Sequence, residues 1–168
     1  MDSPTVGVVD LGNIGGRVAR VLLDAFDVCV FDVDEDAVAR LAEAGARGCE
    51  SGAAVGRRAD VVLLALPSDD ALVAATLGDD GVVAGLGAGD VLVDTSTVSP
   101  GASERVRTAT EERGAAFLDA PVSGGARNAE TGDLVVLVAA RRRRSTGWGR
   151  SSTRSHGRST TSARRAPG

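Results

Sequence analysis

Residues 6–32 read VGVVDLGNIGGRVARVLLDAFDVCVFD and contain, in order, the parts of one strand-helix-strand unit. Residues 6–9 include three valines in a short apolar run, which is typical of a parallel strand buried on both faces. A glycine-rich turn at residues 12–16 leads into a helix. Residues 28–31 form a second apolar run that ends at Asp32. The pattern predicts two neighbouring parallel strands joined by a helix.

The helix of this unit has apolar side chains at three- and four-residue spacing. We expect this spacing to place one apolar stripe against the sheet. The stripe consists of Val18, Val21, Leu22 and Ala25.

The glycine turn itself predicts a ligand. Gly12, Gly15 and Gly16 remove side chains from the backbone where the helix begins, and free N–H groups there suit the doubly anionic pyrophosphate of a dinucleotide. Asp32 is placed to accept hydrogen bonds from the ribose hydroxyls of the adenosine. Its carboxylate would repel a phosphate on that ribose, so the pattern favours NAD over NADP.

Asp10 departs from the expected pattern. It occupies the first position of the GxGxxG fingerprint, where residues 10–15 read DLGNIG. Aspartate tolerates a left-handed backbone better than most residues, but its carboxylate would lie close to the pyrophosphate. Two like charges about 4 Å apart repel each other by roughly 1 kcal/mol in water and several-fold more when shielded from it. We expect the site to form but to bind its ligand more weakly than a glycine version.

Strands and helices alternate through the rest of residues 1–140. Further strands are expected at residues 60–66, 90–97, 115–121 and 133–138, and further helices at residues 34–45, 51–58, 69–77 and 101–114. A chain of 168 residues suits one domain rather than two. The sequence therefore predicts a single α/β domain of the Rossmann type, with a doubly wound and mostly parallel sheet.

Polar residues follow three of the expected strands. These segments are residues 66–68, 95–97 and 119–125. Each segment alone would also suit an ordinary turn or a helix cap. Ligands of doubly wound sheets bind outside the carboxyl ends of the strands, and all three segments lie at that rim. We therefore expect them to line the ligand site.

Four stretches together resemble a known family. They read VGVVDLGNIGGRVARVLL from residue 6, ADVVLLALPS from residue 59, VLVDTSTVSPG from residue 91 and FLDAPVSGGARNAETGDLVVLV from residue 117. In order and spacing they are similar to the N-terminal half of the β-hydroxyacid dehydrogenases, the family that contains 3-hydroxyisobutyrate dehydrogenase and 6-phosphogluconate dehydrogenase. The resemblance covers residues 6–139, and the DAPVSGG segment is its most specific part.

The resemblance implies roles for individual residues. The pyrophosphate would face Leu11, Gly12, Asn13 and Ile14, with Gly15 in the same cofactor-binding turn. Asp32 would bind the ribose of the adenosine. Leu66 and Pro67 would contact the cofactor edge, and Thr97 would lie on the nicotinamide side. Ser123, Gly124 and Gly125 would hold the carboxylate of a small 3-hydroxy acid through hydroxyl and backbone N–H groups.

Family members transfer a hydride between the substrate and a nicotinamide, while a lysine acts as general acid and base. This sequence contains no lysine, and its one histidine is His156. The expectation is a truncated, catalytically incomplete dehydrogenase that still binds a dinucleotide. A folded domain that binds NAD without turning it over stays open as a further alternative.

Residues 141–168 differ in composition from the rest of the chain. They contain nine arginines and no acidic residue, whereas residues 1–140 contain ten arginines and all 23 acidic residues. We expect an unstructured tail because the segment has no apolar periodicity. One explanation is a reading-frame shift, which turns repeated GAC codons into CGA. The alternative is a basic arm that binds nucleic acid, so a nucleic-acid partner is expected only if the tail is genuine.

The remaining composition indicates a soluble protein. No run of residues reaches the length of a membrane span, and the N-terminus does not resemble a signal peptide. Cys29 and Cys49 lie in or beside apolar segments, which favours reduced thiols over a metal site or a disulfide. We expect a cytoplasmic location and no contact with membranes.

Overall fold

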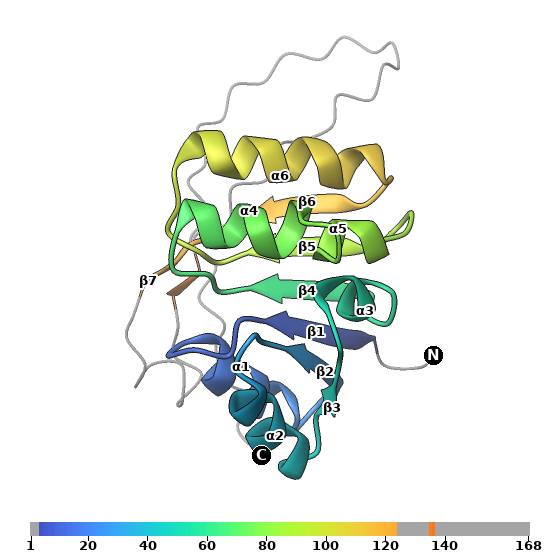
Figure 1. The fold of residues 1–168 in the computed structure, drawn as a ribbon, viewed down its shortest axis with the longest axis vertical. Coiled ribbons are helices and arrows are strands. Elements are labelled where there is room, and N and C mark those ends of the chain that lie inside the picture. The colour runs from blue at the N-terminus through green and yellow to red at the C-terminus, as the bar shows by residue number, and fades with distance from the viewer. Residues whose placement is uncertain (1–3, 124–134, 137–168) are drawn as a thin grey trace, which may run out of the picture.

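The computed structural model describes residues 4–123 and 135–136 of the chain (Figure 1). The elements are β1 (Thr5–Val9), α1 (Gly15–Leu22), β2 (Asp27–Phe31), α2 (Glu35–Glu43), β3 (Arg47–Gly48), α3 (Gly52–Gly56), β4 (Val61–Leu64), α4 (Asp69–Leu77), α5 (Val82–Gly85), β5 (Val91–Asp94), α6 (Pro100–Glu112), β6 (Ala116–Asp119), β7 (Val122–Ser123) and β8 (Val135–Val136).

Six of the strands form one parallel sheet in the order β3-β2-β1-β4-β5-β6. The chain starts at the centre of the sheet, builds outward through β2 and β3, and then returns to β1 to continue through β4, β5 and β6 (Figure 1). This order is that of a doubly wound dinucleotide-binding fold. The predicted fold class is confirmed.

Each face of the sheet has its own apolar core. One core lies under α1 and α2 and includes Val8, Val30 and Leu41. The other lies under α3 to α6 and includes Val62, Leu64 and Leu92. Because alternate residues of one strand point to opposite faces, a central strand must be apolar throughout. The buried residues 6–9 of β1 meet this requirement, as predicted.

The buried side of α1 differs from the predicted stripe. Its buried residues are Gly15 and Ala19, whereas the Val21 side chain is 40% exposed. Ala25 lies beyond the end of the helix at Leu22 and is exposed. The predicted apolar face is therefore right only in part. Leu22 packs against the core under α1 and α2, whereas Val21 and Ala25 are exposed. Small residues, which allow the helix backbone to approach the strands closely, pack against the sheet beside Leu22.

Three short features were not predicted in this form. β3 and α5 fall in segments expected to be connections. The segment expected as a strand at residues 133–138 contributes β8, which pairs antiparallel with β7 in a separate two-stranded sheet. The main sheet is therefore wholly parallel.

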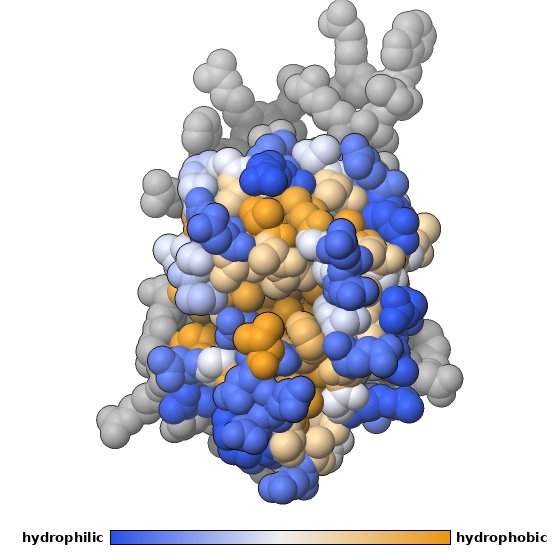
Figure 2. Space-filling model, viewed as in Figure 1, coloured by the Kyte–Doolittle hydropathy of each residue, from blue (hydrophilic) through white to orange (hydrophobic). Residues whose placement is uncertain are grey.

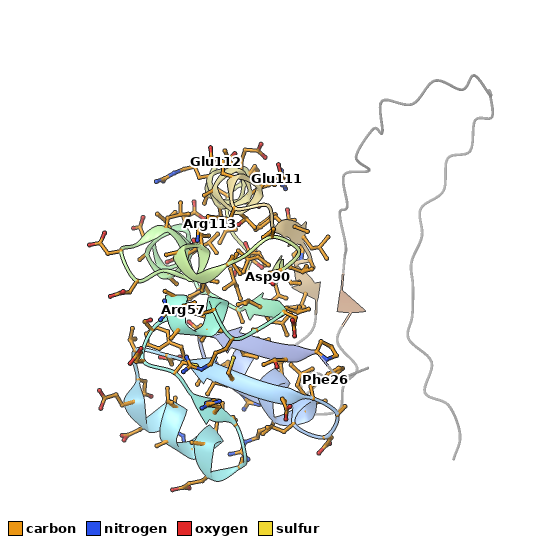
Figure 3. All side chains as sticks on the ribbon, turned by 90° about the vertical axis from the view of Figure 1, so that its right-hand side faces the viewer. Phe26, Arg57, Asp90, Glu111, Glu112 and Arg113 are labelled. Atoms are coloured by element: carbon orange, nitrogen blue, oxygen red, sulfur yellow. The ribbon has the colours of Figure 1, made fainter. Side chains whose placement is uncertain are left out.

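The amino ends of the strands are held by the end of α6 (Figure 3). Arg113 follows α6 and donates hydrogen bonds to the carbonyl oxygens of Leu86, at 3.3 Å, and Ala84, at 3.1 Å. Asp90 lies at the same end and accepts a hydrogen bond from the Gly87 N–H. These contacts fix the segment between α5 and β5.

Within the described ranges, no helix is both long and apolar enough to cross a membrane. Figure 2 shows that the apolar residues on the face viewed in Figure 1 gather across its middle, with polar residues around them. The predicted unstructured tail of residues 141–168, and the predicted domain boundary at residue 140, lie outside the described residues.

We expect Gly85→Ala to destabilise the fold. A Cβ atom on Gly85 would lie 2.1 Å from the carbonyl oxygen of Ala53 in α3, and neither backbone can move without displacing a helix. Overpacking of this kind costs about 1–3 kcal/mol. Urea unfolding followed by circular dichroism should show a lower midpoint.

Gly87→Ala is the matched control, two residues along the chain. A Cβ atom there would have Asp90 Oδ2 as its nearest neighbour, at 3.5 Å, which is ordinary contact. Its unfolding midpoint should equal or slightly exceed that of the parent chain, because alanine restricts the unfolded state. Equal midpoints for the two variants would contradict the proposed close packing of α3 and α5.

Candidate functional site

A cavity of about 560 Å³ lies at the carboxyl ends of β1, β4 and β5. It is lined by Asp10, Gly12, Asn13, Ile14, Ala65, Leu66, Pro67, Thr95, Ser96, Thr97 and Val122. The segments after these three strands therefore meet in one place. Leu66, Pro67 and residues 95–97 line the cavity, whereas Ser68 caps α4.

A second cavity of about 590 Å³ lies beside the first and shares Asp10, Leu66 and Pro67 with it. Its other walls come from the end of β2, the segment before α3, the helix α4 and the loop that follows α4. These walls include Phe31, Asp32, Val33, Ser51, Ala71 and Ala75. The two cavities form one cleft across the carboxyl edge of the sheet, divided at the shared residues.

The turn between β1 and α1 is built on close backbone contacts. A Cβ atom on Gly15 would lie 1.9 Å from the Asp10 carbonyl oxygen, and one on Gly16 would lie 2.7 Å from that of Leu11. No larger residue fits at these two positions without moving the turn. The glycines thus let α1 begin directly against the end of β1.

The amino end of α1 faces the cleft without a side-chain cap. Ile14 is its N-cap residue and caps nothing, whereas side chains cap the amino ends of α2, α3, α4 and α6. In the described part of the chain, the N–H groups of Asn13 and Ile14 donate no hydrogen bond. Two backbone donors and the positive end of the helix dipole are therefore presented to the cleft.

Asp32 ties the ends of β1 and β2 together. Its Oδ2 accepts a hydrogen bond of 2.5 Å from the Leu11 N–H, and its Oδ1 accepts one of 2.8 Å from the Asp34 N–H. The carboxylate also lines the second cavity. Because each carboxylate oxygen has two lone pairs, Asp32 can accept further hydrogen bonds from hydroxyl groups in that cavity.

Asp10 has a strained position for a residue with a side chain. Its φ of 71° is the one positive value among the described non-glycine residues. Its Oδ1 accepts a hydrogen bond of 2.9 Å from the Gly12 N–H. Burial raises the pKa of the Asp10 carboxyl above its ordinary value, and the nearby Asp32 raises it further, against the lowering effect of the Gly12 hydrogen bond.

Buried polar groups hold the loops after β4 and β5. Ser96 Oγ accepts a hydrogen bond of 2.9 Å from the Leu66 N–H, and the Thr95 hydroxyl donates one of 2.6 Å to the Leu64 carbonyl oxygen. The Ser96 N–H in turn donates to Oδ1 of Asp94, which is fully buried. These contacts fix the wall that Leu66 and Thr95 contribute to the first cavity.

Comparison with known proteins assigns the chain to a family. The family model described as the NAD binding domain of 6-phosphogluconate dehydrogenase matches residues 5–147. The chain belongs to this family. It is 39% identical over 134 residues to the 3-hydroxyisobutyrate dehydrogenase of Pseudomonas aeruginosa, an alignment that covers 79% of this chain and 45% of that protein.

Solved structures agree with this assignment. The 3-hydroxyisobutyrate dehydrogenase of Mycobacterium tuberculosis with L-serine superposes with a TM-score of 0.75 and 28% identity, over 83% of this chain and 47% of that one. Psf3 in complex with NADP+ and 2-OPP gives a TM-score of 0.75 and 31% identity, over 81% of this chain and 49% of that one. The chain spans less than half the length of the curated relatives it matches first.

The structure brings most of the predicted cofactor residues to the cleft. Gly12, Asn13, Ile14, Leu66, Pro67 and Thr97 line the first cavity, and Asp32 lines the second. Leu11 and Gly15 line neither: Leu11 is buried in the core under α1 and contributes its N–H to Asp32, and Gly15 is buried in the turn. The Ser123 side chain, Gly124 and Gly125 lie outside the described residues.

Sequence reasoning missed the wall of the second cavity. Residues 50–52 and the small residues of α4 come from segments that show no motif. The available signal was the fold itself, since the loop after β3 and the helix after β4 must flank the end of β2. Among the described residues, no group of three His, Cys, Asp or Glu side chains could hold a metal ion.

We expect Asp94→Asn to become relatively more stabilising as the pH rises. Burial raises the pKa of Asp94, Asp119 on the neighbouring strand raises it further, and Oδ2 has no hydrogen-bond partner. The folded state therefore favours the neutral carboxyl. The stability due to this preference is complete below the ordinary pKa of an aspartate and is lost as the pH rises through the raised value.

Urea midpoints at pH 3.5 and pH 7 measure this effect. The midpoint of the variant minus that of the parent chain should be more positive at pH 7, because only the parent then buries a charge. The exposed Asp24→Asn serves as the control and should show little change between the two pH values. A difference for Asp94→Asn that does not depend on pH would contradict the raised pKa.

Proposed function

We propose that this chain is the NAD-binding domain of an oxidoreductase that acts on a small 3-hydroxy acid. The observation that carries the proposal is the cleft around the uncapped amino end of α1, with backbone donors at its centre and a carboxylate on one side. Membership of the family supports the same ligand, because the matching domain is described as NAD-binding.

The residues present fit a dinucleotide. The pyrophosphate would lie at the amino end of α1 and accept hydrogen bonds from the Asn13 and Ile14 N–H groups. The adenosine would occupy the second cavity, whose apolar wall includes Ala71, Ala75 and Val33, and its ribose would reach Asp32. The nicotinamide, which supplies or accepts the hydride, would occupy the first cavity beside Thr97.

Asp32 supports NAD rather than NADP as the cofactor. In the proposed binding mode its carboxylate would meet the ribose hydroxyls of the adenosine, and a phosphate on that ribose would add a second negative charge there. The relatives include a protein solved with NADP+, so the choice rests on this residue of the chain and not on the family.

The substrate half of the proposal rests on the relatives. Proteins named 3-hydroxyisobutyrate dehydrogenase are among them, and one was solved with L-serine. Ser123, Gly124 and Gly125 remain the predicted carboxylate site. Because the 168 residues contain no lysine, we propose that this chain binds the cofactor but does not complete proton transfer to or from the hydroxyl group. A cytoplasmic location stays a prediction.

A basic nucleic-acid-binding tail remains an alternative role for residues 141–168. Those residues lie outside the described part, and no relative named above points to nucleic acid. The dinucleotide site therefore takes precedence.

Calorimetric titration of the full chain with NAD+ and NADP+ tests the cofactor. We expect NAD+ to bind more tightly, and Asp32→Asn to shift the ratio of the two dissociation constants toward NADP+ by roughly tenfold, since removing a charge about 4 Å from a phosphate is worth about 1 kcal/mol or more. The asparagine oxygen can still accept a hydrogen bond from the Leu11 N–H, so the turn is kept. The ratio of the two dissociation constants then reports the loss of the charge.

Asp34→Asn is the matched control for this ratio. Asp34 lies two residues from Asp32, but its side chain caps α2 by accepting from the Asp36 N–H and does not line the cavity. It should lower stability slightly and leave the ratio unchanged. An unchanged ratio of the two dissociation constants in Asp32→Asn would contradict the assignment of Asp32 to the ribose.

An assay for turnover tests the catalytic half of the proposal. The chain is mixed with NAD+ and a series of short 3-hydroxy acids. The absorbance of reduced nicotinamide should rise no faster than in the same mixture without the protein. The physical reason is the missing lysine, since a positioned acid-base group contributes about 10² to 10⁴ in rate. Clear reduction of NAD+ by the purified chain would show that another group moves the proton.

A further inference from the structure

Asp10 lies at the junction of the two cavities, and its carboxylate accepts a hydrogen bond from one backbone N–H of the glycine turn. It lines both cavities, and its Oδ1 accepts the Gly12 N–H at 2.9 Å. A Cβ atom on Gly12 would also lie 2.9 Å from this oxygen, so the carboxyl group is directly against the turn. In the fingerprint this position is a glycine, and the turn is then free of carboxylate charge.

We propose that Asp10 couples dinucleotide binding to the uptake of one proton, so that the cofactor binds to the form of the chain in which the Asp10 carboxyl is neutral. This inference rests on the proposed function. It adds a residue that replaces the first glycine of the usual turn and sets how tightly, and at which pH, the chain holds a pyrophosphate.

The charged side chains that line the cavities beside Asp10 are negative. Asp32 approaches it from the end of β2, and Glu50, Asp79 and Asp80 line the second cavity that Asp10 borders. The loops after β4 and β5 contribute no titratable side chain to the first cavity. The amino end of α1 opposes these charges, and the Arg17 guanidinium of α1 donates to the Asn13 carbonyl oxygen in the same turn.

A pyrophosphate at the amino end of α1 would add two negative charges beside this carboxyl group. Burial already raises the pKa of Asp10, and the neighbouring Asp32 raises it further. The added anion raises the same pKa again, because it disfavours the charged form. A ligand that raises a pKa must bind with proton uptake, so affinity falls as the pH rises between the pKa values of the free and the bound chain.

The neutral form keeps the turn intact. A protonated carboxyl group still has a carbonyl oxygen that can accept from the Gly12 N–H, and its O–H can donate to a phosphate oxygen. Asparagine reproduces the neutral group closely, since it has the same acceptor and tolerates the left-handed backbone that Asp10 adopts at a φ of 71°. Asp10→Asn therefore separates charge from shape.

Calorimetric titration of the full chain with NAD+ between pH 4.5 and 8.5 tests the inference. The dissociation constant of the parent chain should rise with pH, by up to tenfold per pH unit, and reach a constant value at the acidic end. The heat measured in buffers of different ionisation enthalpy should report the uptake of up to one proton. Asp10→Asn should show neither effect and should bind at least tenfold more tightly than the parent at pH 8.

Two further variants complete the test. Asp10→Gly should behave as Asp10→Asn does, which guards against failure of one variant to fold. Asp34→Asn removes a nearby charge without touching the turn, and it should keep the proton uptake of the parent.

The outcomes separate the inference from the proposed function. Tight, pH-independent binding by the parent would mean that Asp10 turns away from the cofactor, and the inference would be wrong while the function stands. Binding with the same pH profile in all variants would assign the proton to another group and would also overturn it. No binding of NAD+ by the parent or by any variant would overturn the proposed function and the inference with it.

Discussion

The close approach of the Asp10 carbonyl oxygen to Gly15 is the contact on which the rest of the site depends. A Cβ atom on Gly15 would lie only 1.9 Å from that oxygen, so the backbone there comes closer to the end of β1 than a residue with a side chain allows. This proximity places the first turn of α1 at the carboxyl edge of the sheet, so its uncapped N–H groups open into the cleft. The same edge receives Asp32 from β2 and Leu66 from the loop after β4. A longer or looser turn would move the donors away from both.

The fold could be predicted from the sequence where burial imposes a pattern. Central strands buried on both faces require continuous apolar runs, and residues 6–9 and 61–64 show them. β3 carries no such run, because Arg47 and Gly48 are exposed at the edge of the sheet. The packed face of α1 was predicted only in part for a related reason. Besides Leu22, contact there is made through Gly15 and Ala19, and a hydrophobic pattern gives little weight to residues that pack by being small.

The site could be predicted in part because its centre is local and its walls are not. The glycine turn and Asp32 lie within one strand-helix-strand unit, so spacing along the chain decides their geometry. The second cavity is formed by segments more than 40 residues apart, which meet only through the sheet order. No spacing rule connects Ser51 with Ala75. The buried bond from the Leu66 N–H to Ser96 is likewise long-range, and it explains why a serine after β5 matters to a loop after β4.

Stability and affinity make opposite demands on the Asp10 carboxylate of the turn. Asp10 accepts a hydrogen bond from the Gly12 N–H, and Asp32 accepts one from the Leu11 N–H. These two bonds hold the turn between β1 and α1. A glycine at position 10 would lose one bond, worth about 1 kcal/mol, while removing a charge from the path of an anion. In the proposed binding mode, the sequence keeps a turn that is held by its own carboxylate at some cost in affinity for the pyrophosphate. Such an exchange is expected at ligand sites, where the groups that recognise the ligand are seldom those that would stabilise the fold most.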